Sequence, residues 1–168
     1  MDPSLAEAWQ RLVARLIDGL ILAVIMSPLW IWFFGWYLHK LTNILPDDPN
    51  DPVAMDHLMN AELNLMGISL LVGLVGGTIA FVYDGFQHAK WGQTLGKRAM
   101  KIKVVTLSGR APLSTFAAVK RAALYAYAPQ VPGIGGIFSL LDSLWLLWDK
   151  PHRQCLHDKV ADTVVIKV

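Results

Sequence analysis

The sequence predicts an all-α membrane protein: a small transmembrane helix bundle with two clear spans, a third region broken by proline and glycine, and a short cytoplasmic β-ribbon. The 168 residues are 54% hydrophobic and only 17% charged, whereas soluble domains carry about a quarter charged residues. Two long runs are almost free of charge, and the basic residues gather in particular loops. This composition argues against a soluble enzyme, a nucleic-acid-binding protein or a disordered adaptor, and the length predicts one domain, residues 1–168.

The first predicted span is Leu16–Tyr37, 22 residues with one ionisable side chain, Asp18. As a helix it would extend about 33 Å, enough to cross a hydrocarbon core of about 30 Å. The second is Leu63–Tyr83, 21 residues with no charge. Three small residues recur at every fourth position along it: Ser69, Gly73 and Gly77. They form one helical face that permits close approach of another helix, so we expect this face to pack against protein and to be the candidate surface for oligomerisation.

The third predicted region, about 113–148, contains an apolar run that prolines and glycines interrupt between Pro129 and Gly136. These residues break helices. Two half-helices, about 113–128 and 134–148, therefore fit better than one continuous helix. The region either crosses once or enters the membrane and returns as a broken hairpin, and the irregular backbone between its halves must be shielded by protein or line a polar cavity.

The distribution of basic residues predicts the orientation, because Lys and Arg are retained on the cytoplasmic side. Residues 38–62 carry one lysine against five acidic residues, whereas residues 84–121 carry eight basic residues. The first loop should face outward and the loop 84–112 should face the cytoplasm. The amino terminus then lies inside, and the basic tail 149–168 is expected inside too. This is the topology of a multi-pass membrane protein with both ends in the cytoplasm.

Ionisable residues at membrane depth are the candidate site. Arg11, Arg15 and Asp18 are spaced i, i+4, i+7 and so share one helical face. A lone carboxylate one turn inside the hydrocarbon is costly, so Asp18 is expected either to form an ion pair with Arg15 that fixes helix depth or to act in a proton or cation relay. Asp142 raises the same alternatives, as a second carboxylate of a cation site or as the partner of an arginine.

Other motifs do not support catalysis, a cofactor or a metal. The segment Gly92–Lys97 resembles a phosphate loop but is one residue short, and Arg98 stands where magnesium binding needs Ser or Thr. The single cysteine, Cys155, lies near His157 without a second cluster of metal ligands. No nucleophile, base and orienting group recur together, so we expect no enzyme.

Two segments have β-strand character. Lys101–Val105 alternates charged and aliphatic side chains and is followed by a Ser-Gly turn signal. Ala161–Val168 is rich in β-branched residues. Pairing between them would make the ribbon and require the loop and the tail to lie on the same side of the membrane.

Three ordered motifs resemble the RDD family of bacterial integral membrane proteins, named for one arginine and two aspartates. They are Trp9-x-Arg11-x-x-Ala14-x-x-Ile17-Asp18, Gly92-Gln-Thr-Leu-Gly96-Lys97 with Ile102-Lys-Val104, and Arg153-Gln-Cys-Leu-His157-Asp158-Lys-Val-Ala161-Asp-Thr163. By position, the resemblance implies that the family arginine is Arg11, with Arg15 as the competing assignment, and that the aspartates are Asp18 and Asp158. It implies transport of ions or small ligands, with sodium/proton antiport proposed for some members.

Two functions follow as hypotheses. In the first, the chain transports a monovalent cation, a proton or a small ligand, with Asp18 and Asp142 acting against Arg11 and Arg15. A homo-oligomer or a membrane-complex partner then supplies the enclosed volume that three spans lack. In the second, it is a non-catalytic scaffold or assembly factor whose basic loop binds lipid headgroups or a partner protein. The bilayer is a partner in both, nucleic acid in neither.

Overall fold

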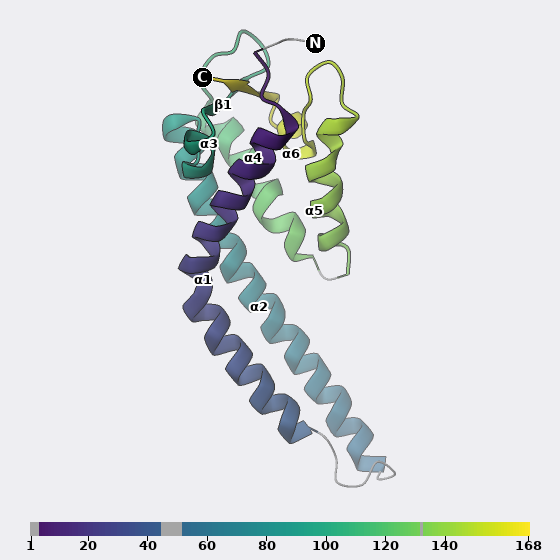
Figure 1. The fold of residues 1–168 in the computed structure, drawn as a ribbon. Coiled ribbons are helices and arrows are strands. Elements are labelled where there is room, and N and C mark those ends of the chain that lie inside the picture. The colour runs from purple at the N-terminus through teal and green to yellow at the C-terminus, as the bar shows by residue number, and fades with distance from the viewer. Residues whose placement is uncertain (1–3, 45–51, 132) are drawn as a thin grey trace.

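Two long helices dominate the structure, a computed structural model that describes residues 4–44, 52–131 and 133–168. They are α1 (Ala8–Ile44) and α2 (Pro52–Trp91). Over the described ranges, both are long and apolar enough to cross a membrane. They run antiparallel, and their far halves project beyond the rest of the molecule (Figure 1). Each helix continues past its predicted span, so much of the loop expected at 38–62 is helical, apart from 45–51, which lies outside the described residues.

Pro28 lies within α1 without ending the helix. Proline has no backbone N–H and therefore leaves the carbonyl four residues earlier without its usual donor. That carbonyl belongs to Val24, and the hydroxyl of Ser27 donates to it at 2.8 Å. A neighbouring hydroxyl group thus satisfies the backbone and lets one helix pass through the apolar region.

The third region is a pair of short helices rather than one span. It consists of α4 (Thr115–Tyr127), the 3-10 turn η1 (Ala128–Gln130), α5 (Gly135–Leu144) and a second 3-10 turn, η2 (Trp145–Leu147). At about 1.5 Å per residue, α4 and α5 extend roughly 20 Å and 15 Å, less than the hydrocarbon thickness. The two helices lie beside only one half of the α1–α2 pair (Figure 1).

The hairpin covers two of the three residues of the small-residue face of α2, Gly73 and Gly77. A Cβ built on Gly73 would lie 3.1 Å from the side-chain oxygen of Gln130, and one on Gly77 would lie 3.2 Å from the carbonyl oxygen of Ala126. Ser69 remains exposed. The two glycines allow α4 and η1 of the same chain to approach closely, so their part of the face is not available to a second copy.

A two-stranded antiparallel sheet closes the end where both termini lie. The strands are β1 (Ile102–Thr106) and β2 (Thr163–Lys167), with Ile102 opposite Lys167 and Thr106 opposite Thr163. This confirms the predicted ribbon. The amino-terminal segment adds a short third edge, since the amide of Ala6 donates to the carbonyl of Val165 at 2.9 Å. The inner side chains pack with α1 and α4 in a small core: Ala6, Ala14, Ile102, Val104, Leu113, Ala118 and Val165.

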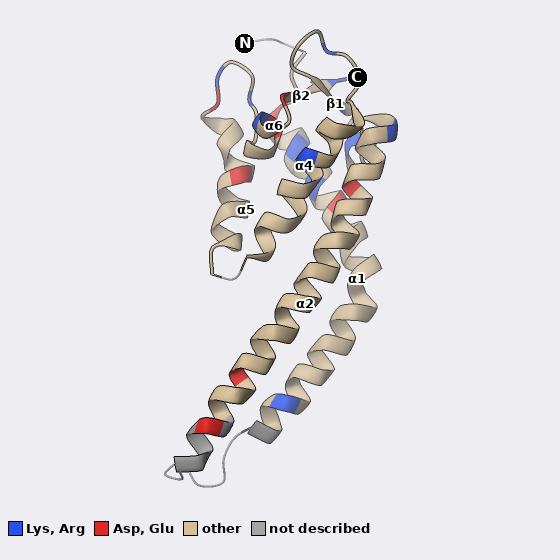
Figure 2. Ribbon diagram, turned by 180° about the vertical axis from the view of Figure 1, so that it is seen from behind, with Lys and Arg blue, Asp and Glu red and all other residues tan. Residues whose placement is uncertain are grey.

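Charged residues are concentrated near this closed end, and the middle of the α1–α2 pair is almost free of them (Figure 2). The remaining short helices, α3 (Leu95–Ala99) and α6 (Leu156–Val160), lie at the same end. Each comes just before a strand of the ribbon, and α3 packs against α1 while α6 packs against α4. They carry several of the polar side chains described next.

Candidate functional site

Asp158 is the centre of a buried ion-pair cluster. It is 1% exposed and caps α6, accepting the backbone N–H of Cys155 at 3.1 Å. One carboxylate oxygen binds Arg11 of α1 at 3.3 Å, and the other binds Arg121 of α4. The two guanidinium groups, together with the backbone hydrogen bond, hold the pKa of Asp158 far below its ordinary value although burial opposes this.

Arg11 ties the first helix to the tail as well as to α6. Its guanidinium donates to the carbonyl of Arg153 at 2.7 Å and to that of Val165 at 3.4 Å. Its Nε has no hydrogen-bond partner among the described residues. This sequence-predicted arginine therefore joins three segments far apart in the chain.

A second network joins α4, α5 and α6 through His157. Its Nδ1 lies 2.7 Å from one carboxylate oxygen of Asp142, and its Nε2 lies 3.0 Å from the guanidinium of Arg121. A guanidinium can only donate, so Nε2 is the accepting nitrogen and the ring proton is on Nδ1, directed at Asp142. The Asp142 carboxylate also accepts the backbone N–H of His157 at 3.0 Å. Asp142 is thus a paired residue that orients His157.

Arg15 lies beside this second network and is more loosely held than Arg11. It is hydrogen-bonded to the hydroxyl of Ser143 and lies 3.8 Å from Asp142. Its guanidinium carbon is 4.7 Å from the centre of the Tyr125 ring. The side chain remains 29% exposed. Arg15 therefore contributes a cation that is only partly neutralised.

Asp18 is buried but does not form the predicted ion pair with Arg15. Its carboxylate accepts the hydroxyl of Tyr83 at 2.8 Å, the hydroxyl of Thr94 at 2.5 Å and the backbone N–H of Gly96 at 2.8 Å. The expected Arg15–Asp18 pair is wrong, because Arg15 bonds to α5 instead. Neutral donors from α2 and α3 satisfy Asp18, which fixes α3 against α1.

This arrangement explains the glycine-rich segment. A Cβ built on Gly96 would collide with the carbonyl oxygen of Ala14 and lie 2.9 Å from the Asp18 carboxylate. Only glycine allows this approach. Thr94 caps α3 as well as binding Asp18. The segment that resembles a phosphate loop therefore binds a carboxylate of its own chain.

A third group of ionisable residues, Asp84, His88 and Lys97, was not predicted as part of the site. Asp84 and His88 are one turn apart on α2 and are 7% and 1% exposed. The Nδ1 of His88 is 2.8 Å from the backbone carbonyl of Asp84 and 3.0 Å from its Oδ2, but only the carbonyl is a hydrogen-bond acceptor for it. The Oδ2 atom is left without a hydrogen-bond partner among the described residues.

Lys97 completes this group from α3. Its Nζ lies 3.1 Å from the Nε2 of His88. Burial lowers the pKa of Lys97 to about 8, helped by the positive charge of Arg121, although Asp84 and Asp18 oppose the change. Lys97 therefore releases a proton much closer to neutral pH than an ordinary lysine. The only sequence signals were Asp84 at the end of the second span and the i, i+4 spacing of His88.

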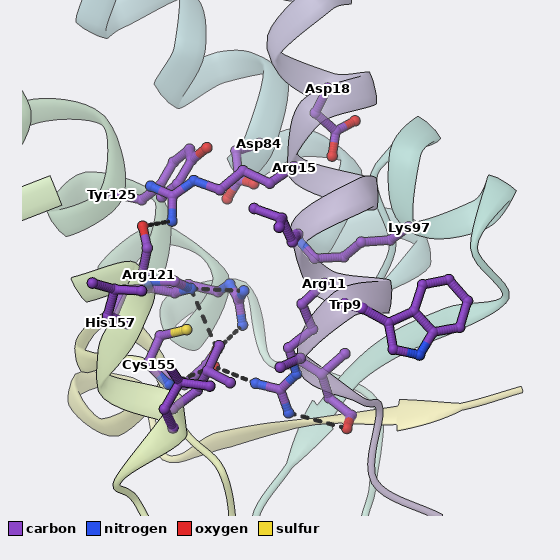
Figure 3. A pocket seen from close by; sticks show the side chains of 18 of the residues that line it. Trp9, Arg11, Arg15, Asp18, Asp84, Lys97, Arg121, Tyr125, Cys155 and His157 are labelled. Atoms are coloured by element: carbon purple, nitrogen blue, oxygen red, sulfur yellow. Dashed lines mark hydrogen bonds and ion pairs between the residues drawn. The ribbon is translucent and has the colours of Figure 1, made fainter. Parts of the chain in front are cut away.

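All three groups border one cavity of about 360 Å³, within the usual range for ligand sites of about 300–1,000 Å³. Its polar wall contains four cationic side chains and three carboxylates: Arg11, Arg15, Lys97, Arg121, Asp18, Asp84 and Asp158. Apolar residues of α1, α5 and η2 line the rest. Figure 3 shows Arg11, Arg15, Arg121 and His157 close together beside this space, with Asp84 and Lys97 nearby and Trp9 pointing away from them.

Cys155, His157 and Asp158 are close enough to reach a single metal ion. Their chemistry does not fit one, because both oxygens of Asp158 already bind guanidinium groups and two positive charges would face the metal. Burial raises the pKa of Cys155 to about 12, so it is a thiol rather than a thiolate ligand at neutral pH.

The fold and the site together define a small integral membrane protein whose spans are tied at one end by a buried ion-pair network. The sequence model of the RDD family matches residues 5–162. The chain belongs to that family, as its three motifs predicted. No curated protein and no solved structure matches it.

Proposed function

We propose that this protein exchanges protons for a monovalent cation across the membrane, using the cavity as the cation site. One observation carries the proposal: Asp84 is buried and borders the cavity, and its Oδ2 has no hydrogen-bond partner among the described residues. A buried carboxylate oxygen without a donor is unfavourable. A small cation beside it would remove that cost.

Lys97 supplies the proton in this proposal. When protonated, its ammonium group provides the positive charge that acts on Asp84 and Asp18. A cation that enters beside Asp84 repels the ammonium, which then releases one proton to water. One charge enters and one leaves, so the site keeps its net charge. His88 lies between Lys97 and Asp84 and couples the two groups.

The hypothesis assigns different roles to the residues that the sequence singled out. Arg11, Asp142 and Asp158 hold α1, α4, α5 and α6 around the cavity. Asp18 positions α3 and thereby Lys97. We propose that the basic end of the molecule faces the cytoplasm of a bacterial inner membrane, and that the α4–α5 hairpin enters the membrane from that side and returns.

Flux measurements on the purified full chain in proteoliposomes test the proposal. A pH gradient is set up, and its collapse on addition of Na⁺, K⁺ or Li⁺ is followed with an entrapped pH dye. We expect one of these cations to collapse the gradient in the wild type, and Asp84→Asn and Lys97→Met to abolish the effect while remaining folded. Lys101→Met, which removes an exposed lysine near α3, is the matched control. A wild type that gives no flux under any gradient refutes the proposal.

The scaffold function is supported by a different observation. The carboxylates of Asp158, Asp142 and Asp18 all bind partners within the chain. In the scaffold function, this network stabilises the fold and has no other role. This non-catalytic role predicts no cation flux. It also predicts that a partner protein co-purifies with the chain and is lost when the basic surface residues are replaced.

A further inference from the structure

The cavity has a second, apolar part that cation exchange does not use. Trp9 and Leu12 of α1 lie on one side of it, and Leu144 of α5 and Leu147 of η2 lie on the other. These four residues are 55%, 58%, 44% and 54% exposed, in that order. A group of exposed apolar side chains is suited to contact with lipid. The cavity therefore opens sideways between α1 and the α5–η2 segment, through an apolar mouth.

A partly neutralised cation lies just inside this mouth. Arg15 is 29% exposed, and its ion pair with Asp142 is long, at 3.8 Å. Arg11 and Arg121, in contrast, are almost fully buried on Asp158. Of the three arginines on the cavity wall, Arg15 is thus the most exposed and has the longest ion pair. Its planar guanidinium matches the two oxygens of a phosphate group.

We infer that the mouth binds a phospholipid with a singly charged anionic head, its phosphodiester on Arg15 and an acyl chain between α1 and α5. Charge supports an anion at this end of the cavity, since the guanidinium of Arg15 is partly exposed and lies 3.8 Å from its paired carboxylate, Asp142. The apolar mouth supports a ligand that arrives from the bilayer rather than from water. A free phosphate would satisfy the arginine but leave Leu12 and Leu144 uncovered.

This inference does not depend on cation exchange, and it is tested by binding alone. The purified full chain in detergent micelles is titrated with phosphatidylglycerol and analysed by native mass spectrometry. Phosphatidylcholine, oleate and water-soluble glycerophosphoglycerol are titrated in parallel. We expect phosphatidylglycerol to bind more tightly than any of the three, because only it combines a net anionic phosphodiester with acyl chains. Equal binding of phosphatidylcholine, or tighter binding of oleate or of the soluble headgroup, overturns the assignment.

Two variants separate the headgroup contact from the acyl contact. Arg15→Gln removes the guanidinium, and we expect about a tenfold weaker affinity for phosphatidylglycerol, the effect of one lost charge-assisted hydrogen bond. Leu144→Trp narrows the mouth without touching an ion pair, so it keeps the test decisive if Arg15→Gln fails to fold. Lys120→Gln removes a positive charge that lies over the Phe116 ring, outside the cavity. An affinity unchanged by both mouth variants, or lowered equally by Lys120→Gln, refutes the site.

Discussion

Replacing Lys97 with methionine should stabilise the protein at neutral pH while destroying its proposed activity. The pKa of Lys97 falls from 10.5 to about 8 on folding. Since each pKa unit corresponds to about 1.4 kcal/mol, a fully buried ammonium would cost the folded state roughly 3 kcal/mol below pH 8. Lys97 keeps partial solvent contact, so we expect a gain of about 1–2 kcal/mol for Lys97→Met at pH 7.

The pH dependence gives this prediction its sign. Between pH 8 and pH 10.5 the unfolded chain still holds the lysine proton and the folded chain has lost it, so the free energy of unfolding rises with pH in this window. Below pH 8 the penalty is complete. The wild type should therefore approach the stability of Lys97→Met as pH rises from 8 to 10.

Unfolding in detergent, followed by intrinsic fluorescence at several pH values, measures the difference. Lys101→Met controls for the loss of a lysine at an exposed position. A Lys97→Met variant that is less stable than the wild type at pH 7, or a stability difference that stays constant from pH 7 to pH 10, would show that the ammonium is not penalised by burial and would remove the basis for its role as proton donor.

Three further predictions concern the network. Asp158→Asn leaves two buried guanidinium groups without their carboxylate and should lower the free energy of unfolding by about 3–5 kcal/mol. Asp149→Asn loses a more exposed pair with a lysine and should lower it by less than about 1 kcal/mol. Chemical unfolding compares the two variants, and equal losses of stability would contradict the buried cluster. Because the pKa of Asp158 is lowered on folding, its contribution is present above its ordinary pKa of 3.8 and is lost as pH falls below that value. Gly96→Ala should separate α3 from α1 and lower the melting temperature, while Gly35→Ala, at a helical site with nothing within 4 Å of a new Cβ, should leave it unchanged or raise it. Cys155 is 6% exposed with its pKa raised to about 12, so a maleimide should label it only after unfolding; rapid labelling of the folded protein would show that the tail opens.

The spans and the ribbon could be predicted because each depends on neighbours in the chain. Hydropathy summed over 21 or 22 residues is sufficient to find a membrane helix, and alternation over five residues is sufficient to find a strand. The break between α4 and α5 was visible for the same reason, since Pro129 and Gly135 act on their own backbone. The family motifs marked Arg11, Asp18 and Asp158 as residues of interest.

The partners of these residues were decided by tertiary structure alone. Arg15 and Asp18 are near enough on one helix to pair, yet Asp18 binds Thr94 and Gly96, and Arg15 binds Ser143, 128 residues away. A buried polar group needs hydrogen-bond partners, and which partners reach it depends on where the other helices cross. For the same reason Lys97 looked like an ordinary loop lysine, and only packing of α3 against α1 and α2 places it beside His88 and lowers its pKa.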